Sequence, residues 1–151
     1  MKMPENSTHL NISRGKNGCF LIYASDTERN GFARTVEYLK KRPWSTEISV
    51  ILGLDAPEGL PAEEYYREIG LILRRTELKH VLCFGKGVEE HRYAFPKMSL
   101  LYDDIADALA DLTKFDFTDE TILINTVRQD DMDSIVALMQ QRVHDTVMHV
   151  D

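Results

Sequence analysis

The sequence predicts a single α/β domain in which a mostly parallel sheet of about five to six strands carries helices on both faces. Two observations lead to this prediction. Short apolar segments of strand length alternate, along all 151 residues, with segments whose apolar residues recur at helical spacing. The strand segments are almost continuously apolar, a pattern typical of parallel strands buried on both faces. We expect right-handed crossovers between them.

The first elements are a turn, a strand, a helix and a second strand. Residues 15–18 contain an Asn–Gly pair, which suits a hairpin, and the apolar strand 19–23 follows directly. A helix is expected over about residues 28–41, where apolar residues share one face and Pro43 ends the pattern. Residues 48–52 then form a buried strand that ends at a glycine.

The next elements continue this alternation. Pro61 is well placed in the first turn of a helix that reaches about Arg75. Residues 80–84 are expected to be the third strand, and residues 99–102 a short fourth strand. The helix predicted over residues 103–112 carries a row of aspartates, which we interpret as a solvated face.

The final part of the chain holds a strand, a helix and a further strand. Residues 121–124 are predicted to be the fifth strand and residues 130–141 the last helix. Residues 146–150 alternate between apolar and polar side chains and therefore predict one more strand. No internal repeat interrupts the chain, so residues 1–151 are expected to form one domain.

Composition and charge argue against several classes of protein. The formal net charge of −7 disfavours a nucleic acid as partner, because binding its phosphates requires clustered Lys and Arg side chains. The longest apolar runs are too short to span a bilayer, and the N-terminal residues lack the apolar core of a signal peptide. We therefore expect a cytoplasmic protein without a membrane partner.

The two cysteines, Cys19 and Cys83, both lie inside apolar runs and are interpreted as buried, reduced thiols. No Cys-x-x-Cys pair or Cys/His cluster occurs in the sequence, so no metal site is predicted. The sequence also places no Ser/His/Asp or Cys/His set of residues together. No catalytic residue is therefore assigned.

Four loops that follow the predicted strands are the candidate ligand sites, because open α/β sheets bind ligands outside the carboxyl ends of their strands. One of them begins Gly-Lys-Gly but lacks the upstream glycine and the Lys-Ser/Thr pair of a phosphate-binding loop, so a plain turn is the simpler interpretation. The four loops comprise residues 24–29, 53–59, 85–90 and 125–131.

Several segments also resemble a known family. The residues that carry the resemblance are, in order, 9–22, 51–53, 58–59, 81–85, 122–124, Arg128 and 132–133. Together they resemble the C-terminal domain of Mur ligases, most closely the type that adds D-alanyl-D-alanine to a UDP-muramoyl-tripeptide. The resemblance implies a Rossmann-like domain that belongs to peptidoglycan synthesis.

The end of the chain carries the least common part of this resemblance. Residues 141–151 resemble the junction of fusion proteins in which the ligase continues into an alanine racemase. The resemblance therefore implies that residues 1–17 lead into the domain and that residues 142–151 are a junction toward a possible racemase domain.

The family implies a role in binding. Its C-terminal domain closes over ATP and magnesium that are bound mainly by a central ATPase domain, and it contacts the nucleotide and the incoming D-alanyl-D-alanine. Cations and magnesium then stabilise charge on the transferred phosphoryl group, and closure excludes water. The residues expected to line this cleft are Asp26, Asn30, Asp55, Glu58 and Arg128.

Simpler interpretations of these residues remain open. Arg128 could start the last helix and pair with Asp130 or Asp131. Asp55 and Glu58 could lie in a solvated turn. Each of these interpretations predicts an ordinary surface residue with no ligand.

The sequence departs from the family pattern in three of the loops. In the loop after the second strand, the acidic residue of the family's Gly-Asp-Met segment is displaced by one position, to Asp55. Residues 24–30 lack the family's tyrosine, and Asn30 also fits a polar residue in the first turn of its helix. Residues 125–128 keep only the arginine of the family's Lys-Gly-Ser-Arg motif, so a positive charge and a hydroxyl are lost. The chain has neither the ATPase domain's phosphate-binding loop nor a racemase lysine site. Alone, it is expected to be inactive.

Two classes of function follow. The first is the C-terminal domain of a peptidoglycan-precursor ligase, cut from a bifunctional ligase and alanine racemase. The alternative is a non-catalytic α/β scaffold or linker attached to an alanine racemase, which the lost motif residues favour. An unrelated flavodoxin-like binding domain is a third class, but it rests on fold analogy alone.

Overall fold

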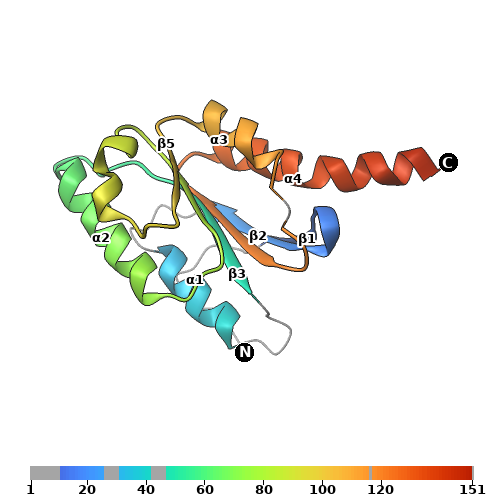
Figure 1. The fold of residues 1–151 in the computed structure, drawn as a ribbon, viewed down its shortest axis with the longest axis horizontal. Coiled ribbons are helices and arrows are strands. Elements are labelled where there is room, and N and C mark those ends of the chain that lie inside the picture. The colour runs from blue at the N-terminus through green and yellow to red at the C-terminus, as the bar shows by residue number, and fades with distance from the viewer. Residues whose placement is uncertain (1–10, 26–30, 42–46, 116, 151) are drawn as a thin grey trace.

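A six-stranded sheet forms the centre of the domain in the computed structural model, which describes residues 11–25, 31–41, 47–115 and 117–150. The strands follow the order β1-β2-β6-β3-β4-β5 (Figure 1), and all neighbouring pairs are parallel except β1 with β2. The predicted mostly parallel α/β sheet is confirmed. The strands are β1 Asn11–Arg14, β2 Phe20–Ser25, β3 Ile48–Gly53, β4 Val81–Phe84, β5 Leu100–Tyr102 and β6 Thr121–Thr126.

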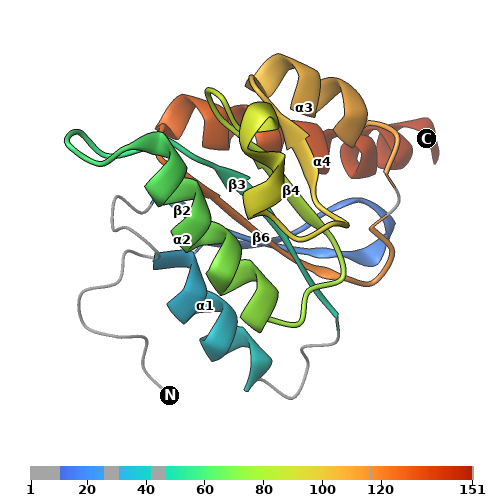
Figure 2. The same cartoon turned by 60° about the vertical axis from the view of Figure 1, so that its left-hand side comes forward.

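Helices cover both faces of the sheet, α1 and α2 on one face and α3 and α4 on the other (Figure 2). Alternate strand residues divide between these two layers. Val50 and Leu52 pack with α1 and α2, whereas Ile51 packs with α3 and α4. Because both faces are covered, the inner strands are almost continuously apolar. The helices are α1 Gly31–Lys40, α2 Ala62–Arg75, α3 Ile105–Leu112 and α4 Gln129–Val150, with 3-10 helices η1 Lys16–Gly18 and η2 Glu89–Ala94.

The predicted Asn–Gly turn forms the hairpin between β1 and β2. Asn17 and Gly18 have positive φ angles of 57° and 77°, which these residue types adopt at low cost. Lys16 in the same turn is buried, and its ammonium group donates to the carbonyls of Leu112 and Phe115 at 3.2 and 3.0 Å. The hairpin is therefore tied to the end of α3.

The strand predicted at residues 146–150 is wrong, because α4 continues as a helix over Gln129–Val150. No proline or glycine occurs in this span to end the helix, and the β preference of isolated valines is weak. Although α4 has 22 residues, no helix in the described ranges is both long and apolar enough to cross a membrane. The helix predicted over residues 28–41 is present over Gly31–Lys40, and residues 26–30 lie outside the described ranges.

The strand order determines where a ligand can bind. The chain leaves β3 towards α2 on one face of the sheet, and it leaves the neighbouring β6 towards α4 on the opposite face. The two connections therefore diverge at the carboxyl ends of β3 and β6, the position where open α/β sheets bind ligands. Two of the four predicted loops, residues 53–59 and 125–131, follow these strands.

Both cysteines are buried, free thiols, as predicted. Burial raises the pKa of Cys19 to about 11 and raises the pKa of Cys83 still further, because each thiolate would lose its hydration. We therefore expect both thiols to react very slowly with an aromatic disulfide reagent in the native state. Full labelling in denaturant is the control, and rapid native labelling of either cysteine would contradict the buried placement.

Candidate functional site

A pocket of about 280 Å³ lies at the carboxyl ends of β3, β4, β5 and β6. The segments that follow these four strands all contribute to its walls. Its volume is near the lower end of the range for small-molecule sites, roughly 300–1,000 Å³. The charged residues that line it are Asp55, Lys86, Asp103, Asp104, Arg128 and Asp131.

Two of the five residues that the family resemblance suggests lie in this pocket. Asp55 follows β3 and Arg128 follows β6, and both residues are exposed. Glu58 is exposed too but does not line the pocket, as the solvated-turn interpretation expects. Asp26 and Asn30 lie outside the described residues.

The two cations of the pocket are available to a ligand. Arg128 forms no ion pair with Asp130 or Asp131, so that simpler interpretation is not supported. Lys86 likewise forms no ion pair within the part of the chain that the structure describes. The hydroxyl of Thr126 donates to the Arg128 carbonyl at 2.7 Å and fixes the turn between β6 and α4.

The sequence alone does not identify Lys86 and Asp103 as site residues. Lys86 belongs to a candidate loop that looks like a plain turn, and Asp103 begins the acidic row of α3. Part of that row has a structural role, since the Asp104 side chain caps α3 by accepting from the Asp107 N–H at 3.0 Å. Their position relative to the strands could have identified them. Lys86 and Asp103 each follow a strand whose carboxyl end lies at the pocket.

The pocket has mixed charge, since its two cations lie among four carboxylates. The nearby N-terminus of α4 adds partial positive charge through the helix dipole. Among the described residues that line the pocket, none is Ser, Thr, Cys or His. The described ranges also contain no group of three or more His, Cys, Asp and Glu side chains that could hold a metal ion. The arrangement therefore favours binding of a small ligand with charges of both signs.

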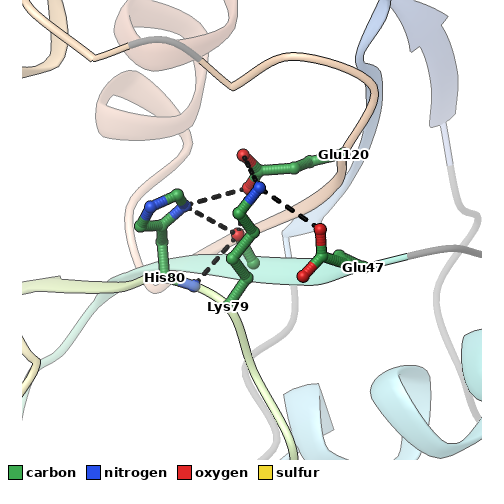
Figure 3. A network of polar contacts seen from close by, with 5 residues as sticks. Glu47, Lys79, His80 and Glu120 are labelled. Atoms are coloured by element: carbon green, nitrogen blue, oxygen red, sulfur yellow. Dashed lines mark hydrogen bonds and ion pairs between the residues drawn. The ribbon is translucent and has the colours of Figure 1, made fainter.

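A second polar cluster lies at the opposite end of the sheet, near the amino ends of β3, β4 and β6 (Figure 3). The Ser49 hydroxyl donates to Glu120 Oε1 at 2.5 Å, and His80 Nδ1 lies 3.0 Å from the same oxygen. Lys79 Nζ pairs with Glu120 Oε2 at 3.5 Å and with Glu47 Oε1 at 3.2 Å. This is not a catalytic triad, because Ser49 is fully buried and donates to the carboxylate. The cluster links strands.

The fold is an α/β domain with a pocket at the carboxyl ends of its parallel strands, and solved structures similar to it include domains of Mur ligases. The MurF ligase from Thermotoga maritima in complex with ADP matches 90% of this chain at a TM-score of 0.64 and 17% identity. A domain from a putative UDP-N-acetylmuramate:L-alanyl-gamma-D-glutamyl-diaminopimelate ligase of Haemophilus ducreyi matches 86% of it at 0.61 and 14%. The UDP-N-acetylmuramoylalanyl-D-glutamyl-2,6-diaminopimelate–D-alanyl-D-alanyl ligase of Acinetobacter baumannii matches 85% at 0.61 and 15%.

These similarities concern one domain of the larger enzymes. The chain spans 31% of the Thermotoga ligase and 28% of the Acinetobacter ligase, but 99% of the Haemophilus chain, which is itself a domain. The sequence matches no protein-family model and no curated protein. At such low identities the similarity establishes the fold, which is that of a Mur ligase domain.

Proposed function

We propose that this chain is the C-terminal domain of a Mur-type ligase that forms an amide bond in a peptidoglycan precursor. The observation that carries the proposal is the pocket at β3 and β6, where Lys86 and Arg128 form no ion pair with any residue that the structure describes, in a domain with the Mur ligase fold. ATP and magnesium are held mainly by a separate central domain, in the cytoplasm, and this domain closes over them. The two cations then contact negative groups of the substrates.

The proposed reaction adds D-alanyl-D-alanine to a UDP-muramoyl-tripeptide. ATP transfers its γ-phosphoryl group to a carboxylate of the tripeptide, and ADP leaves. The amine of the dipeptide attacks the acyl phosphate, phosphate leaves and an amide forms. The dipeptide is a zwitterion, which suits a pocket of mixed charge: Arg128 and Lys86 face its carboxylate or a phosphate, and Asp55 and Asp103 face its ammonium group.

A second candidate is a non-catalytic scaffold attached to an alanine racemase. The charge of the pocket favours this alternative in one respect, because four carboxylates against two cations disfavour a polyphosphate. Val127, which is 41% exposed beside Arg128, also supplies no hydroxyl to a ligand. Such a domain would hold a racemase in place without ligase activity.

The product of the complete natural gene separates these two candidates. We expect phosphate release from ATP that requires both the UDP-muramoyl-tripeptide and D-alanyl-D-alanine. Alanine racemisation is measured on the same preparation. Racemisation without substrate-dependent phosphate release would overturn the ligase proposal and leave the scaffold. A gene that ends at Asp151 would remove the racemase from both candidates.

Replacement of Arg128 by alanine tests the pocket itself. If Arg128 contacts a negative group, Arg128→Ala raises the KM for D-alanyl-D-alanine or ATP about ten-fold, because a charge-assisted hydrogen bond is lost. Lys114→Ala is the control, because this exposed cation lies outside the pocket lining, and it should leave both KM values within about two-fold. Wild-type kinetics in Arg128→Ala would place Arg128 outside the substrate contacts.

A further inference from the structure

Helix α2 contacts the loop that carries Lys86 through a buried tyrosine. Tyr66 of α2 is 1% exposed, and its hydroxyl donates to the backbone carbonyl of Lys86 at 2.6 Å. The Tyr66 ring also contacts His91 and Phe95, with ring centres 5.3 and 5.8 Å apart. A fully packed ring thus directs one hydrogen bond at the residue that brings a positive charge to the pocket.

Hydrogen bonds to residues after β4 and β5 also hold the same loop. His91 Nδ1 lies 2.8 Å from the Gly87 carbonyl oxygen. The Glu89 N–H donates to Asp103 Oδ1 at 3.0 Å, and the Asp103 N–H donates back to Glu89 Oε2 at 3.2 Å. This reciprocal pair joins the segment after β4 to the segment after β5. The backbone around Lys86 is therefore held by contacts from two directions.

The glycines beside Lys86 leave the loop little freedom to sit elsewhere. A Cβ on Gly85 would lie 2.5 Å from the backbone oxygen of Leu54, so this residue passes against the segment after β3. Gly87 has a φ of 77°, a conformation that other residue types rarely adopt. Lys86, between them, is exposed and lines the pocket. Because the backbone of this turn is already held in place, the Lys86 side chain loses less conformational freedom when it binds an anion.

We propose that Tyr66 is a positioning residue, whose hydrogen bond to the Lys86 carbonyl holds the Lys86 ammonium group in place to bind a carboxylate or phosphate of the ligand. The proposal rests on the proposed function for the identity of that ligand. Burial raises the pKa of Tyr66 to about 12, so the hydroxyl keeps its proton and remains a donor at physiological pH. Removing this one hydroxyl should affect ligand binding more than folding.

A double-mutant cycle tests the proposal on this chain, with inorganic phosphate and D-alanyl-D-alanine as ligands in NMR titrations. Lys86→Met should weaken binding about ten-fold, and Tyr66→Phe about five-fold, because the ammonium group is no longer held in place. In the Lys86→Met background, Tyr66→Phe should cause no further loss. Tyr93→Phe is the matched control, since this tyrosine is 57% exposed and its hydroxyl donates to Glu63 on the surface.

Amide hydrogen exchange provides a readout that needs no ligand. The Val88 N–H donates to the Gly85 carbonyl at 3.1 Å and reports on the turn around Lys86. Tyr66→Phe should speed exchange at Val88 at least about ten-fold, while amides in the β3 core keep their protection. Tyr93→Phe should leave Val88 unchanged.

The outcomes distinguish this inference from the proposed function. Equal losses from Tyr66→Phe in the presence and absence of Lys86, or unchanged exchange at Val88, would overturn the positioning role. Absence of binding by the wild-type chain would overturn the assignment of Lys86 as an anion-binding group. Coupling between Tyr66 and Lys86 in a protein without ligase activity would support the positioning role and reject the proposed reaction.

Discussion

Replacing Gly70 with alanine is expected to destabilise the domain by about 3 kcal/mol, although alanine is the better helix former. Figure 2 shows α2 along one face of the sheet. Gly70 is a buried residue of α2, and η2 packs against this helix. A Cβ at this position would lie 1.7 Å from the carbonyl oxygen of Ala94 and 2.8 Å from its carbon. Because these are backbone atoms, α2 and η2 would have to move apart. The roughly 1 kcal/mol gained in helix propensity does not offset this overpacking.

Urea unfolding of Gly70→Ala measures this loss directly. Leu71→Ala, at the next position of the same helix, is the control, because Leu71 is 51% exposed and its removal should change the free energy of unfolding by less than about 1 kcal/mol. A Gly70→Ala variant as stable as the wild type would contradict this prediction, because it would show that η2 can move away from α2 at little cost in free energy. Displacement of η2 in Gly70→Ala should also loosen the loop of Lys86. Residue His91 of η2 contacts the Gly87 carbonyl of that loop, and this contact would be disturbed.

The sequence predicted the fold well where burial acts on both faces of a strand. Residues 48–52 and 121–124 are almost continuously apolar because helices cover both sides of β3 and β6. The edge strand β1 was harder to recognise, since three of its four residues are exposed and its pattern is polar. The strand predicted at residues 146–150 failed because alternation over five residues does not exclude a helix.

The site could be predicted in part, for a similar physical reason. The rule that ligands bind beyond the carboxyl ends of strands pointed to loops that line the pocket, and with them to Asp55 and Arg128. Which loops meet depends on strand order, and the sequence does not show that β4 and β5 lie beside β3. Lys86 and Asp103 were therefore missed as site residues, and so was the hydrogen bond from Tyr66.

The cluster around Glu120 depends even more on strand order, because its members come from the amino ends of three strands (Figure 3). Replacing Glu120 with alanine is expected to cost about 3 kcal/mol of stability. The carboxylate is 1% exposed, and its Oε1 accepts the hydrogen bond of a fully buried Ser49 hydroxyl and contacts His80. Without Glu120, the buried Ser49 hydroxyl loses its short hydrogen bond and keeps only the longer contact with His80 Nδ1 at 3.4 Å, and β3, β4 and β6 lose their common link.

The matched control for this loss is Glu47→Ala. Glu47 pairs with the same Lys79, at 3.2 Å, but its side chain is 65% exposed, so water replaces the lost contact and stability should change little. Because Ser49 acts through Glu120, Ser49→Ala should destabilise the wild type more than it destabilises Glu120→Ala. If Glu120→Ala and Glu47→Ala were equally stable in urea unfolding, the buried carboxylate would not hold the three strands together. This polar cluster lies at the end of the sheet opposite the pocket, so Glu120→Ala should lower stability without changing the contacts of Lys86.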